Sequence, residues 1–190
     1  FHIDENGDVN IEDFESKIKP NTKMLVLNHA SNVIGVKATV SLMTAICKKH
    51  NILCLLDVTQ SIIYENINVN ELNVDFVAGT GHKSLLGPTG CGFLYVKNPN
   101  HLTPLMEGGS IGLGSIGQVH PRILPHKFEA GTLNMLSIVG LHSSLSYIES
   151  KGGRNIARHA LQLTSYLWDS FSQLCEVRLY GTDDFSKKVP

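Results

Sequence analysis

Short apolar runs alternate with segments of helical periodicity along the first half of the chain. Apolar runs of strand length cover residues 24–27, 52–56, 75–78 and 92–96. Helical spacing of apolar residues is found in residues 11–18 and 40–50, and in the second segment Val40, Met43 and Cys47 share one face. This alternation predicts an α/β domain with a mostly parallel sheet, whose ligand site lies at the carboxyl ends of the strands.

The second half of the chain has a different pattern. Residues 107–125 are rich in glycine and carry no charge between Glu107 and Arg122, which predicts a functional loop. Two long helices are predicted over residues 137–149 and 155–174, separated by residues 151–153. Residues 177–180 could open a further strand, for which the sequence shows no partner.

Composition narrows the class of protein. The chain has 190 residues, 42% of them apolar and 17% charged, which is enough to bury the core of one domain. A net charge of -1 without a basic stripe argues against nucleic acid as a partner. No apolar run approaches the roughly 20 residues needed to span a bilayer, and no signal peptide opens the chain, so we expect no membrane partner and a cytoplasmic location. Because the chain begins at Phe1 and stops at Pro190 without a closing element, we expect it to be a piece of something longer.

The four cysteines, Cys47, Cys54, Cys91 and Cys175, are scattered along the chain. They show neither the C-x-x-C spacing of a zinc site nor the density of a disulfide framework. We therefore predict no metal site and interpret the cysteines as buried free thiols.

The most informative local feature is the sequence Thr80-Gly81-His82-Lys83, which directly follows a predicted buried strand. A lysine at the crevice can form a Schiff base with a carbonyl compound, and the adjacent hydroxyl, imidazole and backbone N–H groups can bind a phosphate. A surface lysine in an ordinary turn fits the same four residues, so this segment alone leaves both interpretations open.

Two phosphate-binding motifs are excluded. A Walker A loop requires Gly-Lys, but His82 separates Gly81 from Lys83. Residues 112–117 match G-x-G-x-x-G, yet no strand precedes them, and Pro121 and Pro125 are incompatible with the helix that must follow. We interpret the second match as coincidence.

Asp57 ends the second predicted strand. Alone, an acid at this position caps the next element or is a buried anion opposite a cation. Gln60 lies three residues further on, and Asn32 follows the first strand, so an acid, two amides and Lys83 can converge at one edge of the sheet. Such a set suits pyridoxal 5'-phosphate, in which an acid keeps the ring nitrogen protonated and a lysine carries the aldehyde.

With these residues in view, the sequence resembles the class V aminotransferase family of pyridoxal-phosphate enzymes, and within it the cysteine desulfurase and selenocysteine lyase group. Four segments carry the resemblance in order and spacing, and together they extend through nearly the whole chain. They are residues 29–35 (HASNVIG), 57–60 (DVTQ), 80–83 with 87–92 (TGHK and GPTGCG), and 128–134 (FEAGTLN).

The resemblance implies a role for each matching residue. Lys83 would be the Schiff-base lysine that also moves the proton at the substrate α-carbon, and Asp57 would pair with the ring nitrogen. Gln60 would bind the ring hydroxyl oxygen, with Asn32 beside it and close to the substrate carboxylate. The cofactor phosphate would be bound by Thr80 and His82, and across a homodimer interface by Thr132 of the other subunit.

The same resemblance implies a three-layer α/β/α large domain of the fold type I pyridoxal-phosphate transferases, covering residues 1–150. Residues 151–190 would lead into a truncated C-terminal small domain. The implied reaction of the parent enzyme converts L-cysteine to L-alanine and enzyme-bound sulfur, and the resemblance further implies a sulfur-acceptor protein as partner. A transaminase or lyase of another small amino acid, or a fragment that only binds cofactor, remain alternatives.

The resemblance also shows what these residues lack. In the family, the histidine that stacks on the cofactor precedes the position of Phe1. In the family, an arginine binds the substrate carboxylate, and its position follows that of Pro190. Any sulfur-accepting cysteine also lies after the position of Pro190. None of the four cysteines matches the sulfur-accepting position, so we expect little turnover from these residues alone.

Overall fold

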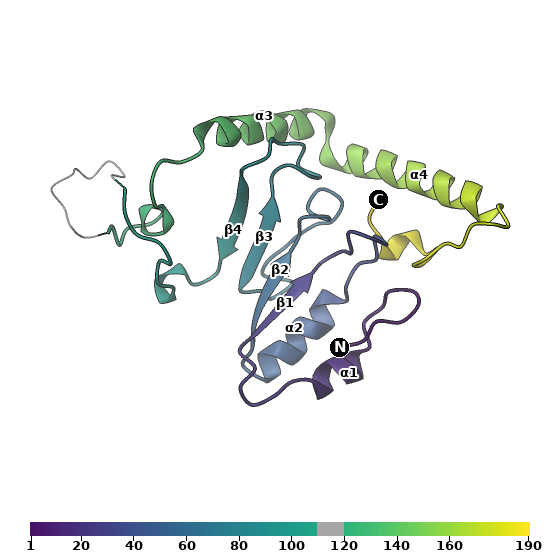
Figure 1. The fold of residues 1–190 in the computed structure, drawn as a ribbon, viewed down its shortest axis with the longest axis horizontal. Helices are drawn as coiled ribbons and strands as arrows, with labels where there is room; N and C mark the ends of the chain where they lie inside the picture. The colour runs from purple at the N-terminus through teal and green to yellow at the C-terminus, as the bar shows by residue number, and fades with distance from the viewer. Residues whose placement is uncertain (110–119) are drawn as a thin grey trace.

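A computed structural model describes residues 1–109 and 120–190 of the chain (Figure 1). Its strands are β1 (Met24–Asn28), β2 (Leu53–Asp57), β3 (Phe76–Thr80) and β4 (Gly92–Val96). Its α-helices are α1 (Ile11–Ser16), α2 (Val40–Lys49), α3 (Met135–Lys151) and α4 (Gly153–Ser172), and short 3-10 helices lie at Pro99–His101, His126–Phe128 and Phe185–Lys187. The predicted α/β class is confirmed.

The four strands form one sheet in the order β1-β2-β3-β4. β1, β2 and β3 run parallel, with Asn28 opposite Asp57 and Asp57 opposite Ala78. β4 returns antiparallel to β3, with Thr80 opposite Gly92. The predicted mostly parallel sheet is therefore confirmed, and the carboxyl ends of β1, β2 and β3 meet at one edge.

The hydrophobic core lies between the sheet and α2. Val40, Met43 and Cys47 are buried on one face of α2, as their spacing predicted, and they join Leu25 and Leu27 of β1 in one apolar cluster. The side chains of β1 that point to the opposite face of the sheet are exposed, and Val26 is 64% exposed. Burial of apolar surface on the α2 face thus anchors β1 and β2.

The two long helices meet at Gly152, close to the break predicted at residues 151–153. Gly152 has a φ of 77°, a conformation that glycine adopts at little cost, and it separates α3 from α4. α3 begins two residues earlier than predicted because the Asn134 side chain accepts a hydrogen bond from the backbone N–H of Ser137. In Figure 1, α3 passes over the end of the sheet at which β3 finishes and β4 starts, and α4 continues away from it.

The prediction of a strand over residues 177–180 is wrong. No strand is formed there, and both Val177 and Tyr180 are exposed, because no neighbouring strand offers the backbone partners that pairing requires. Instead, the Arg178 guanidinium lies 5.0 Å from the centre of the Tyr180 ring. The chain then returns to its N-terminal half, where the backbone N–H of Val189 donates to Gly35 O at 2.8 Å.

The glycine-rich segment is described only in part. Residues 107–109 and 120–125 form neither helix nor strand, in agreement with the predicted loop. The G-x-G-x-x-G match at residues 112–117 lies outside the described residues. Among the helices that the structure describes, none combines the length and apolar character of a membrane span.

Candidate functional site

The turn after β2 is built around Asp57. The Asp57 Oδ1 atom accepts a hydrogen bond of 2.8 Å from the backbone N–H of Thr59, so the acid caps its own turn. The turn continues with a 2.9 Å bond from Ser61 N to Val58 O, and the Val58 side chain is fully buried. This anchoring leaves Gln60 half-buried at the carboxyl edge of the sheet.

Thr59 connects this turn to the end of β3. Its Oγ1 atom accepts a hydrogen bond of 3.3 Å from the backbone N–H of Thr80, and its carbonyl oxygen lies 3.5 Å from the Ser84 hydroxyl that donates to it. The Asp57–Gln60 and Thr80–Lys83 segments are therefore neighbours, as the parallel pairing of β2 and β3 predicted. The sequence alone indicates no role for Thr59, and the structure shows that it joins the two segments.

Thr80 carries an unsatisfied hydroxyl. Its Oγ1 atom is buried and has no hydrogen-bond partner among the described residues. Buried polar groups are nearly always paired, and each exception calls for an explanation. A ligand oxygen at the carboxyl end of β3 would satisfy this hydroxyl.

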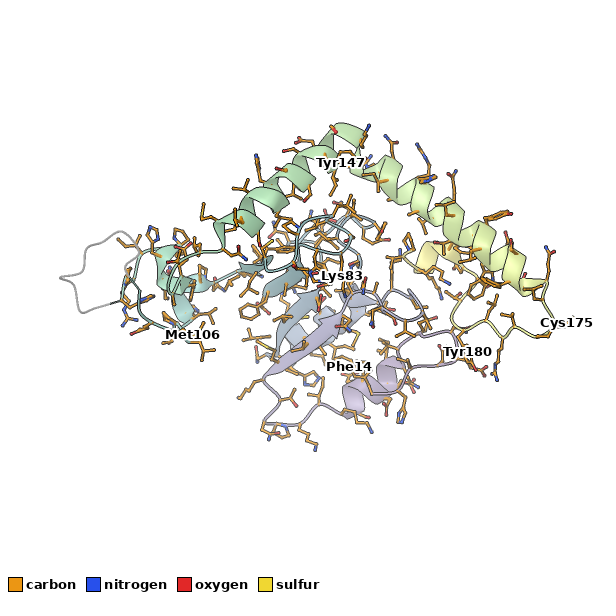
Figure 2. All side chains as sticks on the ribbon, turned by 45° about the horizontal axis from the view of Figure 1, so that its top comes forward. Phe14, Lys83, Met106, Tyr147, Cys175 and Tyr180 are labelled. Atoms are coloured by element: carbon orange, nitrogen blue, oxygen red, sulfur yellow. The ribbon has the colours of Figure 1, made fainter. Side chains whose placement is uncertain are left out.

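Residues 81–91 form the loop that carries His82 and Lys83, and both of these side chains are exposed. The loop is closed at its base by a 3.0 Å bond from Gly81 N to Cys91 O, and a 2.8 Å bond from Gly87 N to Gly81 O draws its middle inward. Figure 2 shows Lys83 near the middle of the molecule, at the end of the sheet. The lysine thus lies on a closed, hydrogen-bonded loop.

Helix α3 supports this loop from above. The Ser137 hydroxyl donates to Thr89 O at 2.9 Å, and the Cys91 thiol donates to Ser137 O at 3.3 Å. A Cβ added to Gly140 would lie 2.7 Å from the Pro88 ring, which shows how closely helix and loop pack. The first turns of α3 therefore limit where the lysine loop can lie.

The remaining two predicted site residues, Asn32 and Thr132, belong to other segments of the chain. Asn32 is exposed in the turn that follows β1, and Thr132 is exposed just before α3. Among the described residues, no hydrogen bond joins Asn32 or Thr132 to Asp57, Gln60, Thr80, His82 or Lys83.

Sequence reasoning missed a polar pair beneath the site. The Nδ1 atom of His29 lies 2.8 Å from the Oγ atom of Ser61, and both side chains are buried. Burial lowers the pKa of His29, while the negative charge of Glu65 raises it and the positive charge of Lys37 lowers it further. A histidine placed directly after a buried strand was the signal available in the sequence.

The cysteine interpretation is correct for Cys47 and Cys54, which are buried free thiols. Burial raises the pKa of Cys54 to about 12, so this thiol stays protonated. The interpretation is wrong for Cys175, which is exposed because it follows the end of α4, far from the sheet (Figure 2). Within residues 1–109 and 120–190, no group of three or more histidine, cysteine or acidic side chains could hold a metal ion.

Comparisons with known proteins agree with this architecture. The chain is 35% identical over 182 residues to a probable cysteine desulfurase of Methanothermobacter thermautotrophicus, covering 94% of this chain and 45% of that protein. The solved structure of an apo cysteine desulfurase from Thermococcus onnurineus NA1 superposes with a TM-score of 0.80 at 30% identity, covering 99% of this chain and 47% of that one. A structure described as SspA in complex with cysteine superposes with a TM-score of 0.63 at 28% identity, covering 76% of this chain and 38% of that one.

These relatives are longer proteins, and the chain spans a little under half the length of the curated relatives that it matches. The sequence also matches the family described as aminotransferase class-V over residues 1–189. The turn at Asp57, the lysine loop and the mostly parallel sheet all lie within the matched region. The chain therefore belongs to the class V aminotransferase family.

Proposed function

We propose that this chain is the cofactor-holding part of a pyridoxal-phosphate-dependent cysteine desulfurase, which converts L-cysteine to L-alanine and enzyme-bound sulfur. One observation carries the proposal: the Asp57–Gln60 turn and the Thr80–Lys83 segment lie side by side at the carboxyl edge of the sheet, joined through Thr59. The names of the relatives support desulfuration, and the SspA structure with cysteine supports this amino acid as the substrate.

The residues present fit pyridoxal 5'-phosphate. The unpaired, buried hydroxyl of Thr80 suits a phosphate oxygen, and the exposed His82 side chain follows two residues later. Asp57 uses Oδ1 for its own turn, and its second oxygen is available to pair with a protonated ring nitrogen. Gln60 would donate to the ring hydroxyl oxygen, and Asn32 would lie near the substrate carboxylate.

When bound, the cofactor would supply an aldehyde that is reactive toward primary amines and a ring that stabilises negative charge at the substrate α-carbon. Lys83 would provide the amine that holds the cofactor, and the same amine would move the proton at the substrate α-carbon. Asp57 would keep the ring nitrogen protonated and positively charged. The positive ring would then stabilise the negative charge at the substrate α-carbon more strongly. Thr59 keeps these two residues on adjacent segments.

A homodimer belongs to the same proposal. Thr132 is exposed, and the residues that follow it include large apolar side chains that are also exposed, with Leu136 at 88%. A second copy covering this surface would remove apolar area from water and bring Thr132 to the phosphate held by the other subunit. We further propose a cytoplasmic location, a sulfur-acceptor protein as partner, and a large domain of residues 1–150 followed by residues 151–190 that lead into a small domain.

The decisive experiment titrates the chain with pyridoxal 5'-phosphate and follows the absorbance band of lysine-bound cofactor. We expect the wild type to show this band, Lys83→Ala to lose it and Lys97→Ala to keep it. Lys97 is the matched control because it is also exposed but follows β4 at the opposite end of the sheet. Borohydride reduction and peptide mass spectrometry then identify the modified lysine.

A band that survives in Lys83→Ala, or a label on another lysine, would refute the role of Lys83. The reaction itself is tested by release of alanine from L-cysteine. Because the chain spans under half of its relatives, we expect cofactor binding from these residues and little turnover. Alanine formation by the longer parent protein, with no transfer of the amino group to a keto acid, would distinguish desulfuration from transamination.

A further inference from the structure

The hydrogen bond between His29 and Ser61 connects the two segments that carry the predicted cofactor ligands. His29 directly follows β1 and starts the segment that leads to Asn32, whereas Ser61 ends the turn that holds Asp57 and Gln60. The backbone N–H of His29 also donates to Asp57 O at 2.8 Å. The side-chain bond of 2.8 Å therefore adds a second tie beyond the end of the sheet.

Both partners are satisfied within the protein. The Ser61 hydroxyl can donate to Val58 O, 3.4 Å away, and its oxygen then accepts the Nδ1 proton of a neutral His29. Both side chains are buried. If one of them is removed, the other loses its hydrogen-bond partner, and water has no access to take that partner's place. The geometry of the turn after β2 thus depends on a bond made from the segment after β1.

A second contact joins the same two segments nearer the surface. Lys37 pairs with Glu65 at 2.6 Å, and the Glu65 backbone N–H donates to Ser61 O at 2.9 Å. These side chains are 20% and 30% exposed, so water and salt weaken this ion pair, whereas the His29–Ser61 bond is shielded. The buried bond is therefore the stronger constraint on Gln60, which directly precedes Ser61.

We propose that His29 and Ser61 form a positioning pair that holds the Asp57–Gln60 turn in the orientation required to bind the ring of the cofactor. Neither residue contacts the cofactor itself in this assignment. The inference rests on the proposed function, but the effect of the pair on the turn exists without cofactor and can be measured separately.

The first test uses the cofactor-free chain and measures backbone amide hydrogen exchange. We expect the amides of Ser61 and Ile62 to exchange roughly tenfold faster in Ser61→Ala and in His29→Leu than in the wild type. His29→Asn keeps a donor nitrogen in the place of Nδ1, so its exchange should remain within about twofold of the wild type. Thr44→Val removes a buried hydroxyl from α2, away from the site, and serves as the matched control.

The second test measures the dissociation constant of pyridoxal 5'-phosphate for the same variants. We expect binding to be roughly fivefold weaker in Ser61→Ala and His29→Leu, with His29→Asn and Thr44→Val close to the wild type. The double variant His29→Leu/Ser61→Ala should bind no more weakly than the weaker single variant, because one bond is lost in all three proteins. Circular dichroism establishes which variants are folded. If His29→Leu does not fold, the comparison of the single variants Ser61→Ala and His29→Asn is sufficient.

The outcomes separate the two hypotheses. If the wild type shows no Lys83-dependent band, the proposed function fails, while the exchange experiment still decides whether the pair holds the turn. Unchanged exchange of Ser61 and Ile62 in Ser61→Ala would overturn the positioning role. Faster exchange with unchanged cofactor affinity would also overturn it. The pair would then hold the turn, but the orientation of the turn would not matter for binding of the cofactor ring.

Discussion

The Oδ1 atom of Asp57 accepts a hydrogen bond of 2.8 Å from the backbone N–H of Thr59. The same carboxylate thus serves the turn with one oxygen and can serve a ligand with the other. Capping and ligand binding, which the sequence left as alternatives for Asp57, are compatible, and different substitutions separate them.

Asp57→Asn keeps an acceptor oxygen for the Thr59 N–H but removes the negative charge. We expect its free energy of unfolding to stay within about 1 kcal/mol of the wild type. For Asp57→Ala the free energy of unfolding should fall by about 1–3 kcal/mol, because the Thr59 N–H loses its acceptor. Both should bind pyridoxal 5'-phosphate at least roughly tenfold more weakly, because the charge opposite the ring nitrogen is gone. Urea denaturation and cofactor titration measure the two effects, and tight binding by Asp57→Asn would contradict the role of the charge.

Gly92 lies where the backbones of β3 and β4 approach each other. A Cβ at this position would lie 2.6 Å from Gly79 O, so Gly92→Ala must displace the end of β3 next to Thr80. We expect a loss of about 1–3 kcal/mol in the free energy of unfolding and weaker cofactor binding. Gly153→Ala is the control, since its Cβ would meet its nearest neighbour at 3.7 Å, and equal stability of the two variants would show that the strand end tolerates the shift.

The buried His29 predicts a pH dependence of stability. Its pKa is lower in the folded chain than the ordinary value of 6.5, so the unfolded chain takes up the proton first as the pH falls. The neutral ring therefore contributes its full stability above about pH 6.5, and this contribution is lost as the pH falls toward the folded pKa. Glu65 and Lys37 are the charged groups that act on the ring.

The measurement is the free energy of unfolding between pH 7.5 and pH 5 for the wild type and His29→Asn. Asparagine does not titrate, so the difference in stability between the two proteins should shrink or reverse as the pH falls. Parallel curves over the whole range would mean that His29 has the same pKa in both states.

The four free cysteines should react with a thiol reagent at different rates. Cys175 is exposed and should react first, whereas Cys47 and Cys54 are buried and should react only when the chain unfolds. Cys175→Ser should therefore remove the fastest phase, and Cys54→Ser should leave it unchanged. Persistence of that phase in Cys175→Ser would place the reactive thiol elsewhere.

The strands and α2 could be predicted because their apolar residues follow simple periods. Val40, Met43 and Cys47 are buried as their spacing indicated. The antiparallel direction of β4 could not be predicted, since an apolar run has the same composition in either direction. It results from the loop of residues 81–91, which reverses the chain and closes with the bond from Gly81 to Cys91.

The site was predictable where one residue follows one strand, as for Asp57 and the segment from Thr80 to Lys83. The contacts between segments were not predictable, because they depend on the register of neighbouring strands. The sequence alone indicates no role for Thr59 or Ser61, yet Thr59 accepts a hydrogen bond from Thr80 N and Ser61 pairs with His29. The strand prediction at residues 177–180 failed for a related reason: pairing requires a neighbour that local sequence does not reveal.

The pairing of β3 with β4 has a consequence for the order of folding. Only residues 81–91 separate these strands, whereas residues 29–52 must close before β1 meets β2, and residues 58–75 before β2 meets β3. Short loops cost less chain entropy to close, and local contacts form faster than distant ones. We therefore expect the hairpin that carries Lys83 to form early in folding, and Asp57 to join it only when the long-range parallel pairing is complete.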